Sequence, residues 1–416
     1  MGSIIPLHTV NLLGYDPAIM YLNPRTVKLF TDIDKITKHD ARDTNPEFNT
    51  EEKFHKSEKA GIIKFFLGNA CNFRCAYCRQ NTHEKIKQHD QSDIDKVVDT
   101  IHYVADVNGP LTIEFWGGEP LLYIDDMIRI VDKLPKHIRY HIVTNGSLVD
   151  KHFYKWISKL NHEIVLSHDG PGQCNRTDDP LEHYESRKYL IKLHREKKNP
   201  TDFVINSVLT KDNTDIFSLA MYLIDIFNMN LIISKMEPVI PYNENASNTA
   251  DDYNKNMLQL EEQLFKGILQ LQEMNLINNV RDIAISIRDF TAEHMDETFC
   301  VNLHEPKCSM TGYHSLCFDW NGVVYPCQVY GGTDITLGKI HEGPCYPHAD
   351  MPKSMYSMKC GDCPVVSLCR GVCPHLNDTY VLSSCKNKYT LYMAILRFIL
   401  YEHNRIITHI GDSIMR

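Results

Sequence analysis

The chain has 416 residues, of which 43% are apolar and 10% aromatic, as in a globular protein with one large core and a smaller module. Its 53 acidic and 44 basic side chains give a net charge of −9, which attracts a nucleic-acid backbone little. It has neither an apolar run of about 18 residues, as a membrane span needs, nor a signal peptide at its start, so we expect a soluble cytoplasmic protein without nucleic-acid or membrane partners.

Residues 1–58 form an N-terminal extension whose fold the sequence does not assign. They contain a possible hairpin, with strands at 18–22 and 26–30 around Asn23-Pro24, followed by a polar stretch. A peptide-binding element is one use for such an extension.

Strands and helices alternate between residues 59 and 240. The helices that we expect here include 94–104 and 124–134, and the strands are expected at 62–67, 111–116, 140–144, 163–167, 203–209 and 231–236. Alternation of this kind indicates a parallel sheet in an α/β fold. About six such units predict a partial (β/α)6 TIM-like barrel, with its site at the carboxyl ends of the strands.

The remaining chain divides into three parts. Residues 241–299 are predicted to form a helical linker, in which one long helix covers about 251–275. Residues 300–387 read as a loop-rich module with a hairpin, 316–320 and 323–325, around the tight-turn signal Asn321-Gly322. Residues 388–416 are expected to carry a C-terminal helix over about 389–407, apolar nearly all round.

Fourteen cysteines are many for a cytoplasmic protein, in which thiols serve as metal ligands or reactive groups more often than as disulfides. One lies at Cys174, ten lie between 300 and 385, and three stand close together as CNFRCAYC: Cys71, Cys75 and Cys78. A structural zinc site takes four ligands, usually in CxxC pairs, whereas this loop supplies three thiolates without an adjacent fourth. On a 4Fe–4S cube, three thiolates leave one iron open to a non-protein ligand.

CNFRCAYC, with the aromatic Tyr77 before its last cysteine, resembles the CxxxCxxC motif of the radical S-adenosylmethionine (radical SAM) superfamily. The resemblance implies that the open iron binds S-adenosylmethionine and that a reductant such as flavodoxin or ferredoxin supplies an electron. Cleavage of the cofactor then yields a 5'-deoxyadenosyl radical that abstracts a hydrogen atom from the substrate. It also implies a set of cofactor-binding residues in the loops after the strands. These are Tyr77, the GGEP-like Gly117, Gly118 and Glu119, and Asn145 after the third strand. Ser167 and Arg176 belong to an S-x-D-G…R stretch, and Leu209 would lie beside the adenine.

The C-terminal cysteines resemble the seven-cysteine SPASM module, which implies two further 4Fe–4S clusters and three in all. By that resemblance Cys360, Cys363, Cys369 and Cys385 hold the outer cluster, and Cys308, Cys327 and Cys373 hold the inner one. The fourth inner ligand is left open between Cys317, Cys300 and an open iron site. A zinc-rich module is the alternative, and Cys174 and Cys345 are expected to be ordinary thiols.

SPASM-bearing radical enzymes mostly modify peptides. We therefore expect an oxidoreductase that installs an oxidative crosslink, carbon to carbon, oxygen or sulfur, in a ribosomally made precursor peptide. The alternatives are formylglycine formation by an anaerobic sulfatase-maturating enzyme and, without catalysis, a zinc-stabilised peptide-binding protein. Tyr325-Pro326-Cys327 is similar to the sulfatase-maturating version, but those enzymes follow this cysteine with a proton-accepting Asp, where this chain has Gln328. The residues do not identify the general base.

Overall fold

The computed structural model describes residues 3–11, 18–23, 28–30, 59–82, 94–295, 315–340, 342, 363–369, 371–373, 376–402, 405–410 and 414–415. Its strands are β1 (Ser3–Asn11), β2 (Ala18–Asn23), β3 (Lys28–Phe30), β4 (Ile62–Phe66), β5 (Thr112–Trp116), β6 (Arg139–Thr144), β7 (Asn161–Ser167), β8 (Phe203–Leu209), β9 (Ile232–Pro238), β10 (Ser315–Asp319), β11 (Val323–Tyr325), β12 (Gly338–Lys339), β13 (Arg405–Ile410) and β14 (Ile414–Met415). Its α-helices are α1 (Ile94–Val104), α2 (Ile124–Val131), α3 (Lys151–Ile157), α4 (Tyr184–Arg195), α5 (Ile216–Phe227), α6 (Glu244–Tyr253), α7 (Met257–Glu273), α8 (Arg281–Met295), α10 (Val366–Cys369) and α11 (Asp378–Glu402). The 3-10 helices are η2 (Arg79–Thr82), η4 (Pro120–Tyr123), η5 (Gly170–Arg176), η6 (Pro200–Asp202), η7 (Ile277–Asn279) and η9 (Gln328–Tyr330).

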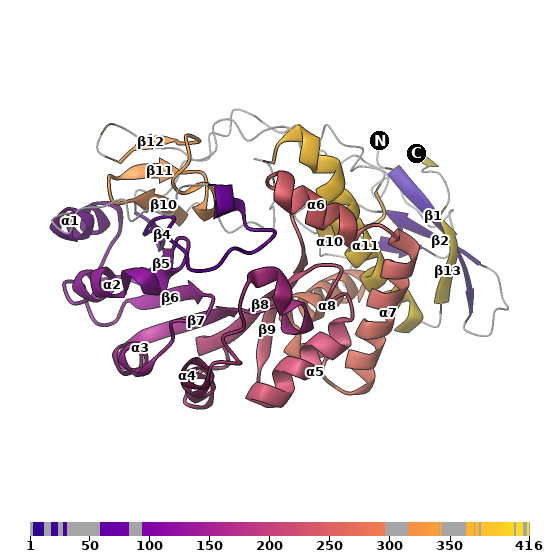
Figure 1. Ribbon diagram of the computed structural model, residues 1–416. Coiled ribbons are helices and arrows are strands. Elements are labelled where there is room, and N and C mark those ends of the chain that lie inside the picture. The colour runs from indigo at the N-terminus through magenta and orange to yellow at the C-terminus, as the bar shows by residue number, and fades with distance from the viewer. Residues whose placement is uncertain are drawn as a thin grey trace.

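The six predicted strands, β4 to β9, pair in chain order and in parallel, which confirms the α/β class and the predicted alternation. Helices α1 to α5 follow these strands and lie along the outer side of the sheet (Figure 1). Helix α1 shows why: its buried residues Ile94, Val97, Val98 and Ile101 recur at helical spacing and form one apolar face. The carboxyl ends of the parallel strands, and the loops that follow them, therefore lie along one edge of the sheet.

The two faces of the sheet differ in chemistry because side chains alternate along each strand. Ile63 and Phe65 of β4 are fully buried in the main apolar core. Lys64, between them, points to the opposite face, where its ammonium lies 3.2 Å from the Glu114 carboxylate of β5. His141 of β6 contacts the same carboxylate at 3.2 Å. Burial alone would raise the pKa of Glu114, but the hydrogen bond from His141 and the charge of Lys64 lower it to about 2.

The C-terminal hairpin is confirmed, and it belongs to the main sheet. Strand β10 pairs in parallel with β4, and β11 and β12 continue the sheet antiparallel beyond it. The sheet therefore has nine strands, from β12 at one end to β9 at the other. The cysteine-bearing C-terminal region is in this way joined directly to the strand that precedes the first cysteine loop.

The predicted C-terminal helix is real, but its bounds were wrong. Helix α11 begins at Asp378, so Cys385 lies inside it, and it ends at Glu402. The residues that follow form β13, which pairs with β1. Apolar residues resume at Ile406 and Ile407 after the polar stretch 402–405, and pattern alone did not separate the helix from the strand.

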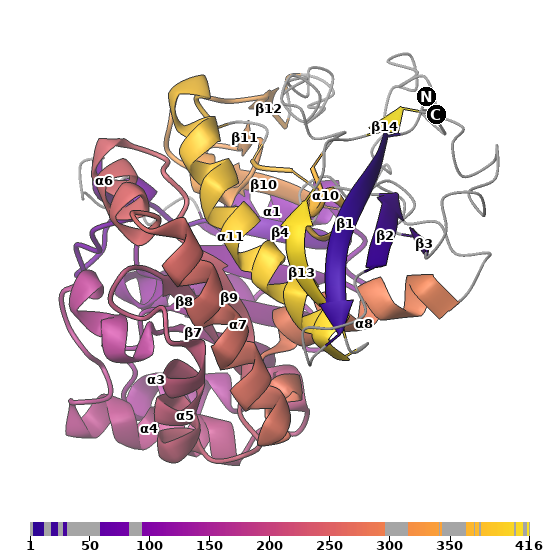
Figure 2. The ribbon, with the colours of Figure 1, turned by 90° about the vertical axis from the view of Figure 1, so that its right-hand side faces the viewer.

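The N-terminal extension and the chain's C-terminal end form a second sheet. Its strand order is β13-β1-β2-β3, and β14 also pairs with β1 (Figure 2). The predicted hairpin corresponds to β2 and β3, which pair antiparallel. The partner of β1 on its other side, β13, is about 400 residues away in the sequence (Leu7 is opposite Ile410), which no local pattern could indicate.

The long linker helix predicted at about 251–275 is two helices, α6 and α7. Asn256 separates them, and its side-chain oxygen accepts a hydrogen bond from the backbone N–H of Gln259.

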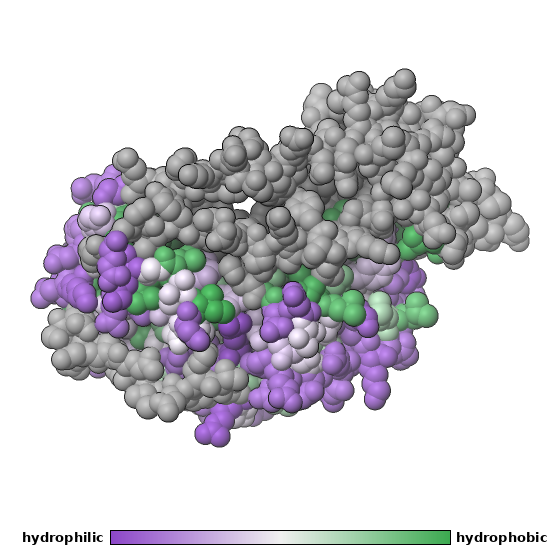
Figure 3. Space-filling model, turned by 90° about the horizontal axis from the view of Figure 1, so that it is seen from above, coloured by the Kyte–Doolittle hydropathy of each residue, from purple (hydrophilic) through white to green (hydrophobic). Residues whose placement is uncertain are grey.

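Seen from above, hydrophilic residues dominate the rim of the described surface, and apolar residues lie mostly nearer its middle (Figure 3). In the described part of the chain, no helix combines the length and apolar character that spanning a membrane requires.

Candidate active site

The loop with Cys71, Cys75 and Cys78 follows β4, at the carboxyl edge of the sheet, as the sequence predicts. Its three thiols are partly buried. Burial is the main reason that the pKa of the Cys75 thiol rises to about 12, and the nearby Cys78 and Cys71 thiols raise it further. The three sulfur ligands are thus close enough to interact electrostatically.

The loop after β5 contacts residues 68–70, which connect β4 to the first cysteine of the loop. Gly118 donates its backbone N–H to the Gly68 carbonyl and Glu119 donates its own to the Ala70 carbonyl, each at 2.8 Å. A Cβ atom on Gly118 would come within 2.3 Å of the Ala70 carbonyl oxygen, and one on Gly117 within 2.5 Å of the Gly68 carbonyl oxygen. The two glycines are therefore required for the two loops to meet.

Glu119 serves this junction with its side chain as well. The carboxylate accepts hydrogen bonds from Thr144 Oγ1 at 2.7 Å, the Asn145 backbone N–H at 2.8 Å and the Leu121 backbone N–H at 3.0 Å. The residue is only 1% exposed, and burial raises its pKa. In this structure the carboxylate joins the ends of β5 and β6, and the predicted contact of Glu119 with a cofactor stays a prediction.

Asn145, at the end of β6, contacts the cysteine loop. Its side-chain nitrogen donates to Asn72 Oδ1 at 2.9 Å, and its side-chain oxygen accepts from Ser147 Oγ at 2.7 Å. Asn72 Nδ2 in turn donates to Ser147 Oγ at 2.8 Å. This triangle fixes the residue next to Cys71. Asn72 was missed at the sequence level because only its spatial neighbours distinguish it from any loop asparagine.

A second brace comes from the segment after β7. Asp169 is fully buried, and its carboxylate lies 2.9 Å from Arg176 Nε, accepts the Tyr77 hydroxyl hydrogen bond and accepts the Val208 backbone N–H at 2.8 Å. The Arg176 guanidinium also faces the Tyr77 ring, 5.5 Å from its centroid. The predicted Tyr77 and Arg176 are thus brought together, with Asp169 as the hub between them.

The backbone of the same segment completes the brace. Ala76 donates its N–H to the Asn175 carbonyl at 2.8 Å, and Arg74 donates its N–H to Thr177 Oγ1 at 2.9 Å. The half of the cysteine loop that carries Cys75 and Cys78 is therefore fixed to η5 along its length.

Two other predicted cofactor contacts lie in different settings. Ser167 ends β7 half-buried, in register with Asn206 of β8, on the face that Lys64 and His141 share. Leu209 is fully buried in the main core, so its side chain packs against the fold. The structure gives Leu209 no open side toward a ligand.

The described C-terminal cysteines fall into two groups. Cys317 and Cys327 pack with Tyr325 and Tyr330 in one small cluster, whereas Cys373 and Cys385 contact a second cluster around Val372, Leu376 and Val381. Electrostatic effects on pKa add to this division. Cys327 and Cys373 both raise the pKa of Tyr330. Cys363 and Cys385 both raise the pKa of Tyr389, and Cys369 raises the pKa of Cys385. Cys373 therefore lies near both groups, and the division into inner and outer ligands stays a prediction. Cys300, Cys308, Cys345 and Cys360 lie outside the described residues.

These thiols fit iron–sulfur chemistry. Among the described residues, no three His, Cys, Asp or Glu side chains converge as a single metal ion would need. A four-iron cube takes its thiolates on separate irons, so its ligands need not meet at one point. Three soft sulfur ligands on one braced loop suit such a cube.

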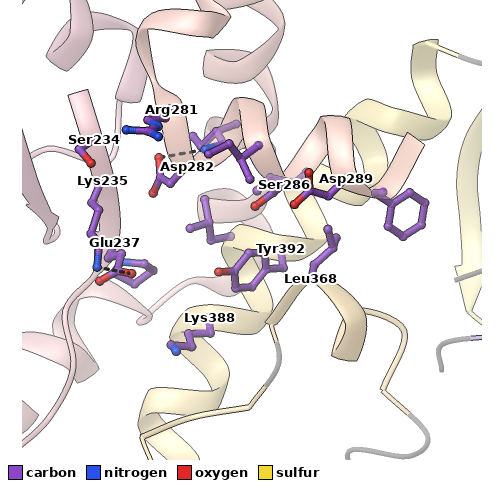
Figure 4. A pocket seen from close by; sticks show the side chains of 16 residues that line it. Ser234, Lys235, Glu237, Arg281, Asp282, Ser286, Asp289, Leu368, Lys388 and Tyr392 are labelled. Atoms are coloured by element: carbon purple, nitrogen blue, oxygen red, sulfur yellow. Dashed lines mark hydrogen bonds and ion pairs between the residues drawn. The ribbon is translucent and has the colours of Figure 1, made fainter. Parts of the chain in front are cut away.

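A pocket of about 360 Å³ lies at the β9 end of the nine-stranded sheet, where this edge strand meets α8 and α11 (Figure 4). Asp282 ties α8 to this edge, because its carboxylate accepts the backbone N–H of Met236 at 2.9 Å, and burial raises its pKa to about 6. Lys235 pairs with Glu237, and Lys388 donates to the Gly371 carbonyl. Several of the charged groups that line the pocket thus have protein partners, which is consistent with a role in closing the edge of the sheet.

Comparisons with known proteins agree with this site. A family model described as the radical SAM superfamily matches residues 65–231. The radical SAM cyclopropyl synthase TigE of Paramaledivibacter caminithermalis is 24% identical over 408 residues, covering 92% of this chain and 81% of its own length. A cysteine-type anaerobic sulfatase-maturating enzyme of Clostridium perfringens is 25% identical over 347 residues, covering 75% of this chain and 88% of its own.

The fold comparison points the same way. The solved structure described as native anSMEcpe with bound AdoMet superposes with a TM-score of 0.56 at 18% identity, covering 82% of this chain and 100% of that one. The version with AdoMet and the Cp18Cys peptide gives a TM-score of 0.55 at 19% identity, covering 82% of this chain and 99% of that one. Both superpositions show that this chain and anSMEcpe share a fold.

Proposed function

We propose that this protein is a peptide maturase that would use a 4Fe–4S cluster and S-adenosylmethionine to form an oxidative crosslink in a precursor peptide. The radical SAM family model that matches residues 65–231 implies both groups. The observation that carries the proposal is the junction of the three-cysteine loop with the Gly117–Glu119 loop, at the carboxyl edge of a parallel sheet. When bound, the cluster and its cofactor would supply a 5'-deoxyadenosyl radical.

The chain's own residues position that chemistry. Cys71, Cys75 and Cys78 would hold the first cluster. Tyr77, Gly117, Gly118, Glu119, Asn145, Ser167 and Arg176 shape or border the place for the cofactor, and Leu209 supports it from the core. We assign the two C-terminal cysteine groups to two auxiliary clusters, with Cys317 as the fourth inner ligand because it packs with Cys327.

A peptide substrate is supported by the solved structure of anSMEcpe that holds the Cp18Cys peptide, and the bond-forming reaction by TigE. TigE matches most of this chain, and its name describes the formation of a cyclopropyl ring. Closing such a ring and forming a crosslink share one chemical balance: a bond forms between two atoms that each lose a hydrogen. When bound, the cofactor would supply the acceptor for one hydrogen atom, and an auxiliary cluster would supply the acceptor for the electron left when the second hydrogen departs as a proton.

Formylglycine formation on a sulfatase is the second candidate, because a sulfatase-maturating enzyme matches three quarters of this chain. Gln328 argues against it. The residue follows Cys327 at the start of η9, and its amide oxygen is buried without a hydrogen-bond partner in the described structure. A side-chain amide cannot accept the proton that aldehyde formation releases.

The test is an anaerobic reaction of the reduced protein with S-adenosylmethionine and the short peptide encoded beside its gene. We expect the peptide to lose two hydrogens per modification, with one 5'-deoxyadenosine formed each time, and to carry no aldehyde that a hydrazide probe captures. A sulfatase peptide should be left unconverted. Efficient aldehyde formation on the sulfatase peptide would favour the second candidate, and stoichiometric zinc in place of iron would leave only a peptide-binding protein.

A further inference from the structure

Arg79, the residue after Cys78, lies between two tyrosine rings from distant parts of the chain. Its guanidinium carbon is 4.0 Å from the ring centroid of Tyr330 and 5.6 Å from that of Tyr242. Both distances are within the range of a cation–π contact. Tyr330 is fully buried, so the contact is screened little by solvent.

The two rings belong to different C-terminal cysteine-bearing clusters. Tyr330 packs with Cys317 and Cys327, and Tyr242 packs against the cluster that Cys373 contacts. Burial is the main reason that the pKa of each tyrosine is raised, and the Cys327 and Cys373 thiols raise both further. The positive charge of Arg79 therefore lies against two rings that pack beside these two thiols.

The backbone at Arg79 is fixed to a third element. Asn243 Nδ2 donates to the Cys78 carbonyl at 3.2 Å, and its Oδ1 accepts the Ala246 backbone N–H at 2.9 Å, which caps α6. The turn between β9 and α6 thus holds the end of the three-cysteine loop. Arg79 stands where this turn, the loop and the C-terminal module come together.

From this junction we infer that Arg79 is a positioning residue that joins the first cysteine loop to the Cys327–Cys373 group and raises the reduction potential of the cluster on that group. The inference rests on the proposed function, because it requires a cluster there. Its physical basis is simple: reduction adds a negative charge to a cluster, and a fixed cation nearby stabilises the reduced form.

The experiment is a redox titration followed by electron paramagnetic resonance on iron-loaded protein, with Arg79→Gln, Arg79→Lys and Arg195→Gln compared. Arg195 is exposed at the end of α4, so its variant makes the same chemical change away from the junction. We expect Arg79→Gln to keep its iron and to lower one cluster's midpoint potential. Arg79→Lys should restore most of the shift, and Arg195→Gln should resemble the wild type.

Product analysis gives a second readout. Arg79→Gln should still cleave S-adenosylmethionine, because the three cysteines remain, but form several-fold more deoxyadenosine per modified peptide than the wild type does. Unchanged cluster potentials in Arg79→Gln would overturn the inference alone, whatever the coupling. Wild-type protein that binds no iron would instead overturn the proposed function, and this inference with it.

Discussion

The first cysteine loop and the C-terminal cysteine segments are held in different ways. Each half of the loop is braced by neighbouring loops: Asn145 and the Gly117–Glu119 loop fix one half, and η5 fixes the other. Around Cys363, Cys369 and Cys373 the backbone hydrogen bonds are local, such as the Cys369 N–H to the Val365 carbonyl, and apolar side chains such as Leu368 pack the segment on the rest of the fold. The first loop is thus fixed by hydrogen bonds to several neighbouring loops, whereas we expect the second region to depend more on crosslinking of its thiols by metal.

Removal of metal should therefore separate the two regions, and this is the largest effect that we expect. After chelation of iron under anaerobic conditions, peptides that span residues 363–373 should lose much of their protection from hydrogen exchange, because the backbone hydrogen bonds there are local and the metal would crosslink the thiols to distant parts of the chain. Peptides that span β5 and β6 should keep theirs. Equal protection of residues 363–373 with and without iron would show that the module folds without metal.

The brace of the first loop can be broken at Asp169. Asp169→Asn should destabilise the protein by about 4 kcal/mol, because it leaves the buried Arg176 without its counter-charge. Denaturant unfolding measures this loss. The matched control is Asp178→Asn, whose exposed pair with His183 should contribute well under about 1 kcal/mol. Similar losses in the two variants would refute the brace.

A smaller loss of stability is expected from a change at Glu114 of β5. Glu114→Gln should cost about 3 kcal/mol, because Lys64 stays buried without a negative partner. Glu163→Gln, at a partly exposed ion pair on β7, should cost about 1 kcal/mol or less. The pKa of Glu114 is lowered to about 2, so its contribution is present above its usual pKa near 4.5 and is lost as the pH falls from there toward 2. Unfolding free energies measured across this range should therefore converge for wild type and Glu114→Gln. Curves that stay parallel would contradict this account.

The smallest expected effect concerns the second sheet. Deleting residues 1–57 removes β1, the partner of β13, and should weaken binding of the precursor peptide more than it weakens cofactor cleavage without peptide, because the barrel begins later. Binding by fluorescence anisotropy and deoxyadenosine release measure the two effects. A truncated chain that binds the peptide as the full chain does would exclude the extension from recognition.

The same comparison explains how much the sequence could predict. The barrel strands and the cysteine loop were found because alternation, turn residues and thiol spacing are local signals. The roles of Asp169, Asn72 and Arg79 were not, since each depends on side chains about 70 to 250 residues away that only the folded chain brings close. For Glu119 the pattern was recognised, but the direction of its carboxylate depends on Thr144 and on the end of β6. The pairing of β1 with β13 joins the two ends of the chain, which no periodicity records.

The central claim is that Cys71, Cys75 and Cys78 hold the cluster that cleaves S-adenosylmethionine. The direct measurement is 5'-deoxyadenosine formed by anaerobically reduced protein, compared among the wild type, the triple Cys→Ala variant at these positions, and Cys174→Ala, an exposed thiol outside all three groups. We expect the wild type, with about twelve irons per chain, and Cys174→Ala to form deoxyadenosine, and the triple variant to form none while keeping about eight irons. Deoxyadenosine from the triple variant would contradict the claim.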